Sequence, residues 1–182
     1  MSTQLTTNED YLFFDYLAPF RWPEKTKEQT SIIRKLVATG EIHIETLLEN
    51  AIAVASKGKL QRIAEDGRDF NDNSDAKKAV SCFRNNNVAK DHWSNTFQIK
   101  SIQNKKGMLR CLCLSKQTKK FHHFAIPFKA YKNLGSYLEI PLDRFSSKQE
   151  PKGIPKGKWM VFEVEDFQTL ATITEEEMLK RM

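Results

Sequence analysis

Cysteines and long apolar runs are scarce in this 182-residue sequence. The three cysteines (Cys82, Cys111 and Cys113) are odd in number and lack the paired spacing of a zinc site, so no disulfide framework is expected. No apolar run approaches the ~18 residues that a membrane span needs, and the N-terminus lacks the basic and apolar regions of a secretory signal. These absences predict a soluble protein of the reducing cytoplasm, with no membrane partner.

Acidic residues are missing from the whole stretch between His92 and Leu138. The same stretch carries Lys100, Lys105, Lys106, Arg110, Lys116, Lys119, Lys120, Lys129 and Lys132. A one-sign stretch of this length is an electrostatic footprint for a polyanion, whereas a solvated basic face is the more usual explanation of a short run. Together with a net charge of +6, it predicts nucleic acid as the partner.

Two helices are expected early in the chain. Thr26 and Gln29 have the spacing of a capping box, and Gly40 marks the end of that helix. A second helix is expected over about 42–57, where apolar residues recur at helical spacing. Before them, residues 1–25 hold a dense aromatic cluster that Pro19 and Pro23 are expected to interrupt. We expect these aromatic side chains to pack on the core or to form an interface with a second subunit.

Strands dominate the rest of the chain. They are expected over 75–83, 96–102, 108–115, 121–128 and 159–164, and Thr174 with Glu177 opens a short final helix. The 108–115 segment is apolar on both faces, which indicates a central strand. The turn before it ends in Gly107, where a positive backbone dihedral is expected. The predicted fold class is α/β or mixed α+β, an antiparallel meander preceded by helices in one domain over 1–182.

The stretch from Asp69 to Lys77 concentrates the chemistry. Its Asn71-Asp72-Asn73-Ser74 segment is strong turn chemistry and predicts a tight hairpin. Alternate residues of a strand share a face, so Asp75 and Lys77 are expected side by side, with Asp69 across the turn. Two carboxylates and an amine in this arrangement can hold a divalent cation and an activated water, as metal-assisted phosphodiester hydrolysis requires. The alternative is a solvated acidic turn at the tip of a hairpin.

The order of helix, acidic turn, strand with a lysine and further strands resembles the PD-(D/E)XK nuclease superfamily, over roughly residues 42–128. Asp69 matches the first aspartate of the family motif, and Asp75-Ala76-Lys77 matches its (D/E)-x-K. Glu49 is the candidate for the helix acid, with Glu45 as the spare. The sequence departs from the pattern at Arg68, where proline is usual, in the aspartate rather than glutamate at 75, and in the short spacing between the aspartates.

A second alignment of the motif competes with the first. In it Asp75 is the first aspartate, and Gln98-Ile99-Lys100 supplies a half-motif in which glutamine replaces the acid. Because a neutral glutamine weakens a metal site, the alignment on Asp69, Asp75 and Lys77 is preferred.

The resemblance implies a restriction endonuclease-like fold, with a central mixed β-sheet flanked by helices. It also implies a Mg²⁺-dependent DNA endonuclease of the Type II restriction class, in which Asp69, Asp75 and Glu49 bind the metal. The catalytic residues would be Asp69, Asp75 and Lys77, with Lys100 and Gln98 in the competing alignment. Cutting both strands of a short palindrome favours a homodimer.

Several polar residues are candidates for contacts with double-stranded DNA. Lysine and arginine neutralise phosphates, while arginine and asparagine can also read guanine and adenine edges. The candidates are Arg84, Asn85, Asn86, Asn87, Lys105, Lys106, Arg110, Lys119 and Lys120. Two other functions remain open: a non-catalytic nucleic-acid-binding domain and a protein-interaction module built on the N-terminal aromatics.

Overall fold

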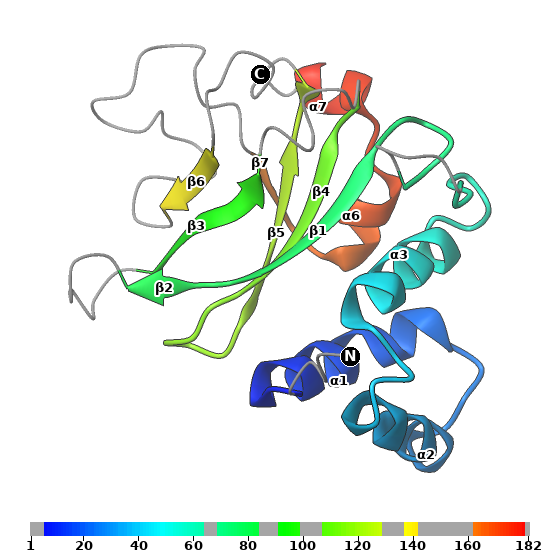
Figure 1. Cartoon of the computed structure of the whole chain (residues 1–182). Helices are drawn as coiled ribbons and strands as arrows, with labels where there is room; N and C mark the ends of the chain where they lie inside the picture. The colour runs from blue at the N-terminus through cyan, green and yellow to red at the C-terminus, as the bar shows by residue number, and fades with distance from the viewer. Residues whose placement is uncertain are drawn as a thin grey trace.

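Three helices precede the first strand of the protein (Figure 1). The computed structural model describes residues 6–63, 69–83, 91–98, 107–128, 137–141 and 162–180. Helix α1 spans Asn8–Arg21, α2 spans Lys27–Ala38 and α3 spans Ile44–Ala55. The expected capping box opens α2, because Thr26 Oγ1 accepts a hydrogen bond from Gln29 N and Gln29 Oε1 accepts one from Thr26 N. Both predicted helices are therefore confirmed.

Helix α1 brings the N-terminal aromatic residues into the core. Phe13, Phe14 and Leu17 are buried within it. Pro19 lies inside α1 rather than interrupting it, so that expectation is wrong. Proline removes one backbone donor and is best tolerated in the first turn of a helix, whereas Pro19 lies in the last turn of α1, which ends at Arg21. The packing prediction is confirmed by these contacts with the core.

A four-stranded mixed sheet forms the centre of the fold. Its strands are β1 (Asp75–Val80), β4 (Leu109–Leu114), β5 (Phe121–Ile126) and β7 (Phe162–Val164), in the order β1-β4-β5-β7. Every residue of β4 is buried, which confirms the prediction of a central strand. The expected antiparallel meander is wrong at one point, because β1 and β4 are parallel. Parallel neighbours need a crossover, and the chain between them passes through a second sheet.

The second sheet has three short strands in the order β2-β3-β6. They are β2 (Cys82–Phe83), β3 (Asp91–Gln98) and β6 (Tyr137–Pro141), all paired antiparallel. Strand β3 begins before the predicted 96–102 segment and includes its first three residues, while 99–102 lie outside the described residues. The chain leaves β1 at Val80 and enters β2 at Cys82, so the two sheets are nearly continuous at this point (Figure 1).

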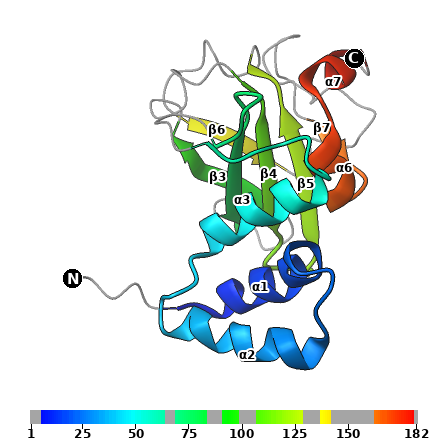
Figure 2. The same ribbon diagram turned by 90° about the vertical axis from the view of Figure 1, so that its right-hand side faces the viewer.

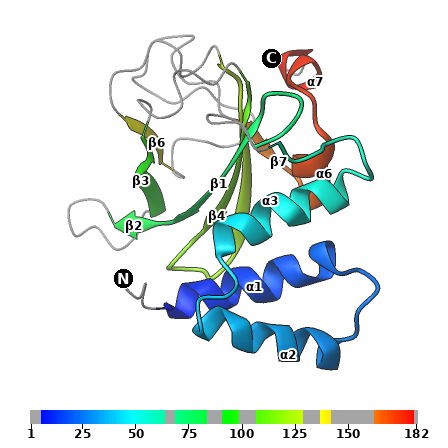
Figure 3. The same ribbon diagram turned by 45° about the vertical axis from the view of Figure 1, so that its right-hand side comes forward.

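Helices cover one side of the four-stranded sheet. Figures 2 and 3 show α3 crossing the sheet, α1 next to α3, and α2 outermost. Helix α3 turns its predicted apolar stripe inward, burying Ile44, Leu47, Leu48, Ala51, Ile52 and Ala55. A helix that was not predicted, α6 (Phe167–Thr172), packs beside α3 and buries Phe167 and Leu170. The mixed α+β class is confirmed by this arrangement.

The chain ends in a short helix, α7 (Glu175–Lys180). Its predicted capping box is present: Thr174 Oγ1 accepts a hydrogen bond from Glu177 N at 3.1 Å, and Glu177 Oε2 accepts one from Thr174 N at 3.2 Å. No helix within the described ranges combines the length and apolar character needed to cross a bilayer.

Candidate active site

Asp69, Asp75 and Lys77 meet at the start of β1. Lys77 Nζ lies 3.2 Å from Asp75 Oδ2, which confirms that the two side chains share a face of the strand. Asp69 reaches across the turn, where one of its carboxylate oxygens accepts a hydrogen bond of 2.8 Å from Ala76 N. The side chains of Asp69 and Asp75 are also hydrogen-bonded to each other. The preferred alignment of the motif thus corresponds to a real cluster of side chains.

The surroundings of Asp69 favour its protonated form more than those of an ordinary aspartate. The pKa of Asp69 is raised to about 7, chiefly by burial and then by the hydrogen bond to Asp75, while the charges of Asp75 and Glu49 act in the same direction. The hydrogen bond from Ala76 N opposes this shift. Two acids sharing a site rarely ionise together, so the loss of the second proton is shifted to higher pH.

The turn that carries Asp69 is held by its own backbone. Asp69 N and Phe70 N both donate to Ser74 O at 3.2 Å, and Phe70 is fully buried. Asn73 adopts the left-handed conformation at φ +67°, which asparagine tolerates better than most residues. The predicted tight turn is confirmed, and Phe70 forms an isolated bridge with Arg62; residues 64–68, which precede the turn, lie outside the described residues.

Arg110 lies under this turn, and its predicted DNA contact is not possible in this structure. The residue is 1% exposed and its guanidinium donates to Ser74 Oγ at 3.1 Å, to Leu170 O at 2.6 Å and to Asp72 Oδ2 at 2.9 Å. The sequence does not indicate this role, because each of the three acceptors lies at least 36 residues from Arg110 in the chain. Arg110 instead ties the acidic turn to α6.

Asp72 completes this polar frame. Its other oxygen, Oδ1, accepts hydrogen bonds from Ser74 N and Ser74 Oγ. Burial alone would raise the pKa of Asp72, but the bonds from Ser74 and the charge of Arg110 outweigh it and hold the pKa below its usual value. Asp72 is therefore an ionised structural residue.

Gly107 presses against the same turn. A Cβ on this residue would lie 1.8 Å from Asn73 O, so no larger residue fits without moving the backbone. Its φ is outside the positive range, and the prediction of a positive dihedral is wrong. Close approach explains the glycine: Asp75 N donates to the neighbouring Met108 O at 3.0 Å.

Glu49 on α3 faces the site but has another partner. Its carboxylate lies 2.5 Å from a guanidinium nitrogen of Arg62, and its charge is close enough to raise the pKa of Asp69. Glu45, the spare candidate, is 66% exposed at its side chain and pairs with Lys78 at 3.5 Å instead. Of the two helix acids, Glu49 is therefore the one whose charge acts on Asp69.

The donor set suits a hard divalent cation only in part. Mg²⁺ binds oxygen ligands, often through one or two carboxylates plus water and substrate phosphate. Asp69 and Asp75 meet that minimum. In the described portion of the chain, however, no group of three or more His, Cys, Asp or Glu side chains is close enough to hold a metal. The residues therefore fit a two-carboxylate magnesium site with Glu49 held back.

The predicted DNA contacts are placed unevenly. Lys119 and Lys120 are exposed in the turn between β4 and β5, at the lower end of the sheet in Figure 1. Since β1 and β4 are parallel and Asp75 starts β1, this turn lies about 16 Å along the strand from the carboxyl pair. The remaining candidates lie outside the described residues: Arg84, Asn85, Asn86, Asn87, Lys105 and Lys106.

The described residues of the competing alignment, Asp75 and Gln98, lie in two different sheets. Gln98 ends β3 in the three-stranded sheet, opposite Tyr137 of β6, whereas Asp75 starts β1 of the four-stranded sheet. Lys100 lies outside the described residues. The Asp75–Lys77 contact thus favours the first alignment.

His122 and His123 point to opposite faces of β5, as predicted for neighbours on a strand. His122 Nδ1 lies 2.7 Å from Glu163 Oε1, while His123 Nε2 is hydrogen-bonded to the hydroxyl of Tyr16. Burial lowers the pKa of His123 to about 4, so it is neutral near pH 7. The pair fastens α1 and β7 to β5.

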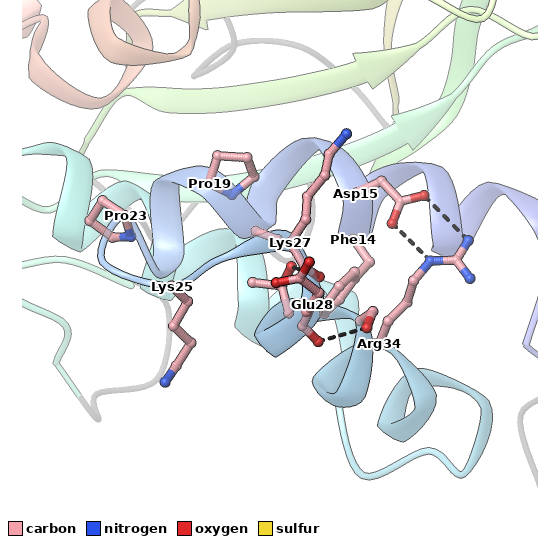
Figure 4. A pocket seen from close by; sticks show the side chains of 11 residues that line it. Phe14, Asp15, Pro19, Pro23, Lys25, Lys27, Glu28 and Arg34 are labelled. Atoms are coloured by element: carbon pink, nitrogen blue, oxygen red, sulfur yellow. Dashed lines mark hydrogen bonds and ion pairs between the residues drawn. The ribbon is translucent and has the colours of Figure 1, made fainter.

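A groove runs between α1 and α2, away from the carboxyl pair (Figure 4). Arg34 crosses it to Asp15, with a nitrogen–oxygen distance of 2.8 Å, and also lies over the ring of Tyr11. Lys25, Lys27 and Glu28 line its rim. The groove is lined by charged residues of both signs, whereas a surface that binds a polyanion is mainly basic.

Comparison of the chain with models of known protein families, with curated proteins and with solved structures found no match to any of them. The arguments for function therefore come from the geometry of this site and from the motif in the sequence.

Proposed function

We propose that this protein is a Mg²⁺-dependent DNA endonuclease whose active centre is the cluster of Asp69, Asp75 and Lys77. The observation that carries the proposal is the hydrogen-bonded carboxyl pair with the Lys77 amine 3.2 Å from one of its oxygens. Two acids and an amine at the start of a strand combine a cation site with a group that can act on water. The same arrangement explains why Asp69 and Asp75 are brought together despite the cost of adjacent charges.

Each residue has a separate task in this mechanism. Asp69 would release its shared proton to solvent, and with Asp75 it would hold a magnesium ion. When bound, that ion would supply Lewis-acid stabilisation of the phosphate and activation of water. Lys77 orients the attacking water and stabilises the charge that develops on the phosphate. Arg110 and Asp72 keep the turn in place beneath them.

We further propose the restriction endonuclease-like fold and a homodimer that cuts both strands of a short palindrome, as the Type II class does. The support is the sequence order of helix acid, aspartate and D-x-K, together with the contact between Asp75 and Lys77 and the hydrogen bond between Asp69 and Asp75. The exposed Lys119 and Lys120 would contact the phosphate backbone away from the cleavage point.

The test is cleavage of supercoiled plasmid in Mg²⁺ and in EDTA. We expect Mg²⁺-dependent discrete fragments from the wild type, and a loss of at least about 100-fold in rate for Asp75→Asn and for Lys77→Met. Asp15→Asn, which removes an exposed carboxylate from α1, is the matched control and should retain full activity. Lys100→Ala distinguishes the two alignments of the motif. This variant should remain active if Lys77 is the catalytic lysine, and it should lose activity if Lys100 is.

The alternative is a non-catalytic nucleic-acid-binding domain. It is favoured by the placement of Glu49 on Arg62, which leaves only two carboxylates together. This function predicts DNA affinity that falls steeply with salt but is indifferent to Mg²⁺. Equal DNA binding by the wild type and Asp75→Asn, with no cleavage of several DNAs, would exclude the enzyme and leave this domain.

A further inference from the structure

The backbone of Arg62 and that of the next residue both contact the turn that carries Asp69. Arg62 forms an antiparallel bridge with Phe70, and the next residue, Ile63, donates to Asp69 O at 2.9 Å. The segment that carries Arg62 is thus fixed directly beside the first aspartate of the motif. Nothing in the motif itself points to this arginine.

The side chain of Arg62 reaches back to α3. One terminal nitrogen lies 2.5 Å from Glu49 Oε2, and the other donates to Asn50 Oδ1 at 3.0 Å. The Glu49 side chain is only 18% exposed, while that of Arg62 is 41% exposed. Glu49 therefore has one strong partner, and that partner is accessible to solvent on its other side.

Glu49 is the candidate for a third carboxylate ligand, beside those of Asp69 and Asp75. Its charge acts on Asp69, yet with Glu49 directed to Arg62 no three acids of the described residues gather closely enough for a metal. We propose that Arg62 is a positioning residue that holds Glu49 away from the carboxyl pair, so that a divalent cation must compete with Arg62 for Glu49. This inference depends on the proposed cation site at Asp69 and Asp75.

The exchange is energetically accessible. Half-exposed ion pairs contribute little free energy, because solvent screens them and the side chains lose freedom. A divalent cation can therefore displace the Arg62 guanidinium from the Glu49 carboxylate. Asn50 still accepts one hydrogen bond from Arg62 after Glu49 is released, which keeps the arginine in place.

The experiment measures Mn²⁺ binding by electron paramagnetic resonance without nucleic acid, since Mn²⁺ takes the same oxygen ligands as Mg²⁺. The proteins are the wild type, Arg62→Ala, Glu49→Gln and the double variant. From the strength of comparable pairs, Arg62→Ala should tighten Mn²⁺ binding about two- to five-fold. The same substitution should have no effect in the Glu49→Gln background, where there is no carboxylate to release.

Two controls make the outcomes distinct. Arg34→Ala removes an equally exposed ion-paired arginine from α2 and should leave Mn²⁺ binding unchanged. Arg62→Gln retains much of the side-chain stem and should reproduce Arg62→Ala if the charge pair is responsible. Equal tightening with and without Glu49 would show that Arg62 acts only as a distant charge and would overturn the inference.

The proposed function has its own readout in the same assay. Asp75→Asn should abolish Mn²⁺ binding whether or not Arg62 acts on Glu49. Loss of binding in Asp75→Asn, combined with unchanged binding in Arg62→Ala, would reject the role of Arg62 and retain the cation site. No Mn²⁺ binding by any of the proteins would reject both.

Discussion

Asp69 and Asp72 are three residues apart in one turn, yet their surroundings are opposite. Asp72 is saturated with partners, because Ser74 and Arg110 donate to both of its oxygens and lower its pKa. Asp69 faces another acid, and its pKa is raised to about 7. The comparison separates two uses of a carboxylate in one turn: the exposed Asp72 is bound by fixed donors and supports the fold, whereas the partly buried Asp69 shares a hydrogen bond with the acid Asp75.

The difference also explains how the site can be strained and still stay in place. Bringing Asp69 and Asp75 together costs free energy, which the surrounding structure must supply. Arg110 supplies part of it by joining the turn to α6 through Leu170 O. The comparison can be tested by substitutions that act on one carboxylate environment and leave the other intact.

The largest effect on stability is expected from Arg110→Met. Removing one partner of a buried ion pair leaves Asp72 and two other acceptors without their donor, and the expected loss is about 3 kcal/mol in the free energy of unfolding. Urea denaturation measures it, and Arg34→Met on the surface is the matched control, with a change below about 1 kcal/mol. A similar small change for both variants would contradict the structural role of Arg110.

A smaller loss is expected from Gly107→Ala. The new Cβ would meet Asn73 O at 1.8 Å, so the turn must shift, at a cost of about 1–3 kcal/mol typical of overpacking. Gly40→Ala is the comparison, since a Cβ there meets no atom within 4 Å and only the positive φ of 76° is unfavourable. NMR spectroscopy checks where the strain lies. If it lies in the turn, the carboxyl resonances of Asp72 and Asp75 should shift in Gly107→Ala but not in Gly40→Ala.

The smallest effect has the opposite sign and depends on pH. Because the folded-state pKa of Asp69 is above its unfolded value, its stabilising contribution is complete below about pH 4 and is lost as the pH rises through about 7. Asp69→Asn removes this loss and should be more stable than the wild type at pH 8 by about 1 kcal/mol. Unfolding measured in EDTA between pH 4 and pH 8 tests this, and parallel curves for both proteins would contradict it.

The sequence predicted the local elements of this fold well. The apolar stripe of α3 and the capping boxes at Thr26 and Thr174 depend on residues a few positions apart, and all are present. The same is true of Asp75 and Lys77, because the alternation of a strand alone puts them on one face.

Predictions failed where the partner of a residue is distant in the chain. The long stretch without acidic residues predicts a DNA contact for Arg110, but its acceptors are Ser74, Asp72 and Leu170. Gly107 was assigned to a turn of its own, but it is required by the backbone of Asn73. In both cases the deciding contact lies more than thirty residues away.

The sequence by itself determined the helices α2, α3 and α7, the central strand β4 and the face shared by Asp75 and Lys77, since each follows from periodicity and local hydrogen bonding. Only the tertiary structure decided that β1 and β4 run parallel. It also decided that Asp69 is hydrogen-bonded to Asp75, and that Arg62 forms an ion pair with Glu49. These features depend on burial and on contacts between distant segments, which a local pattern of residues does not encode.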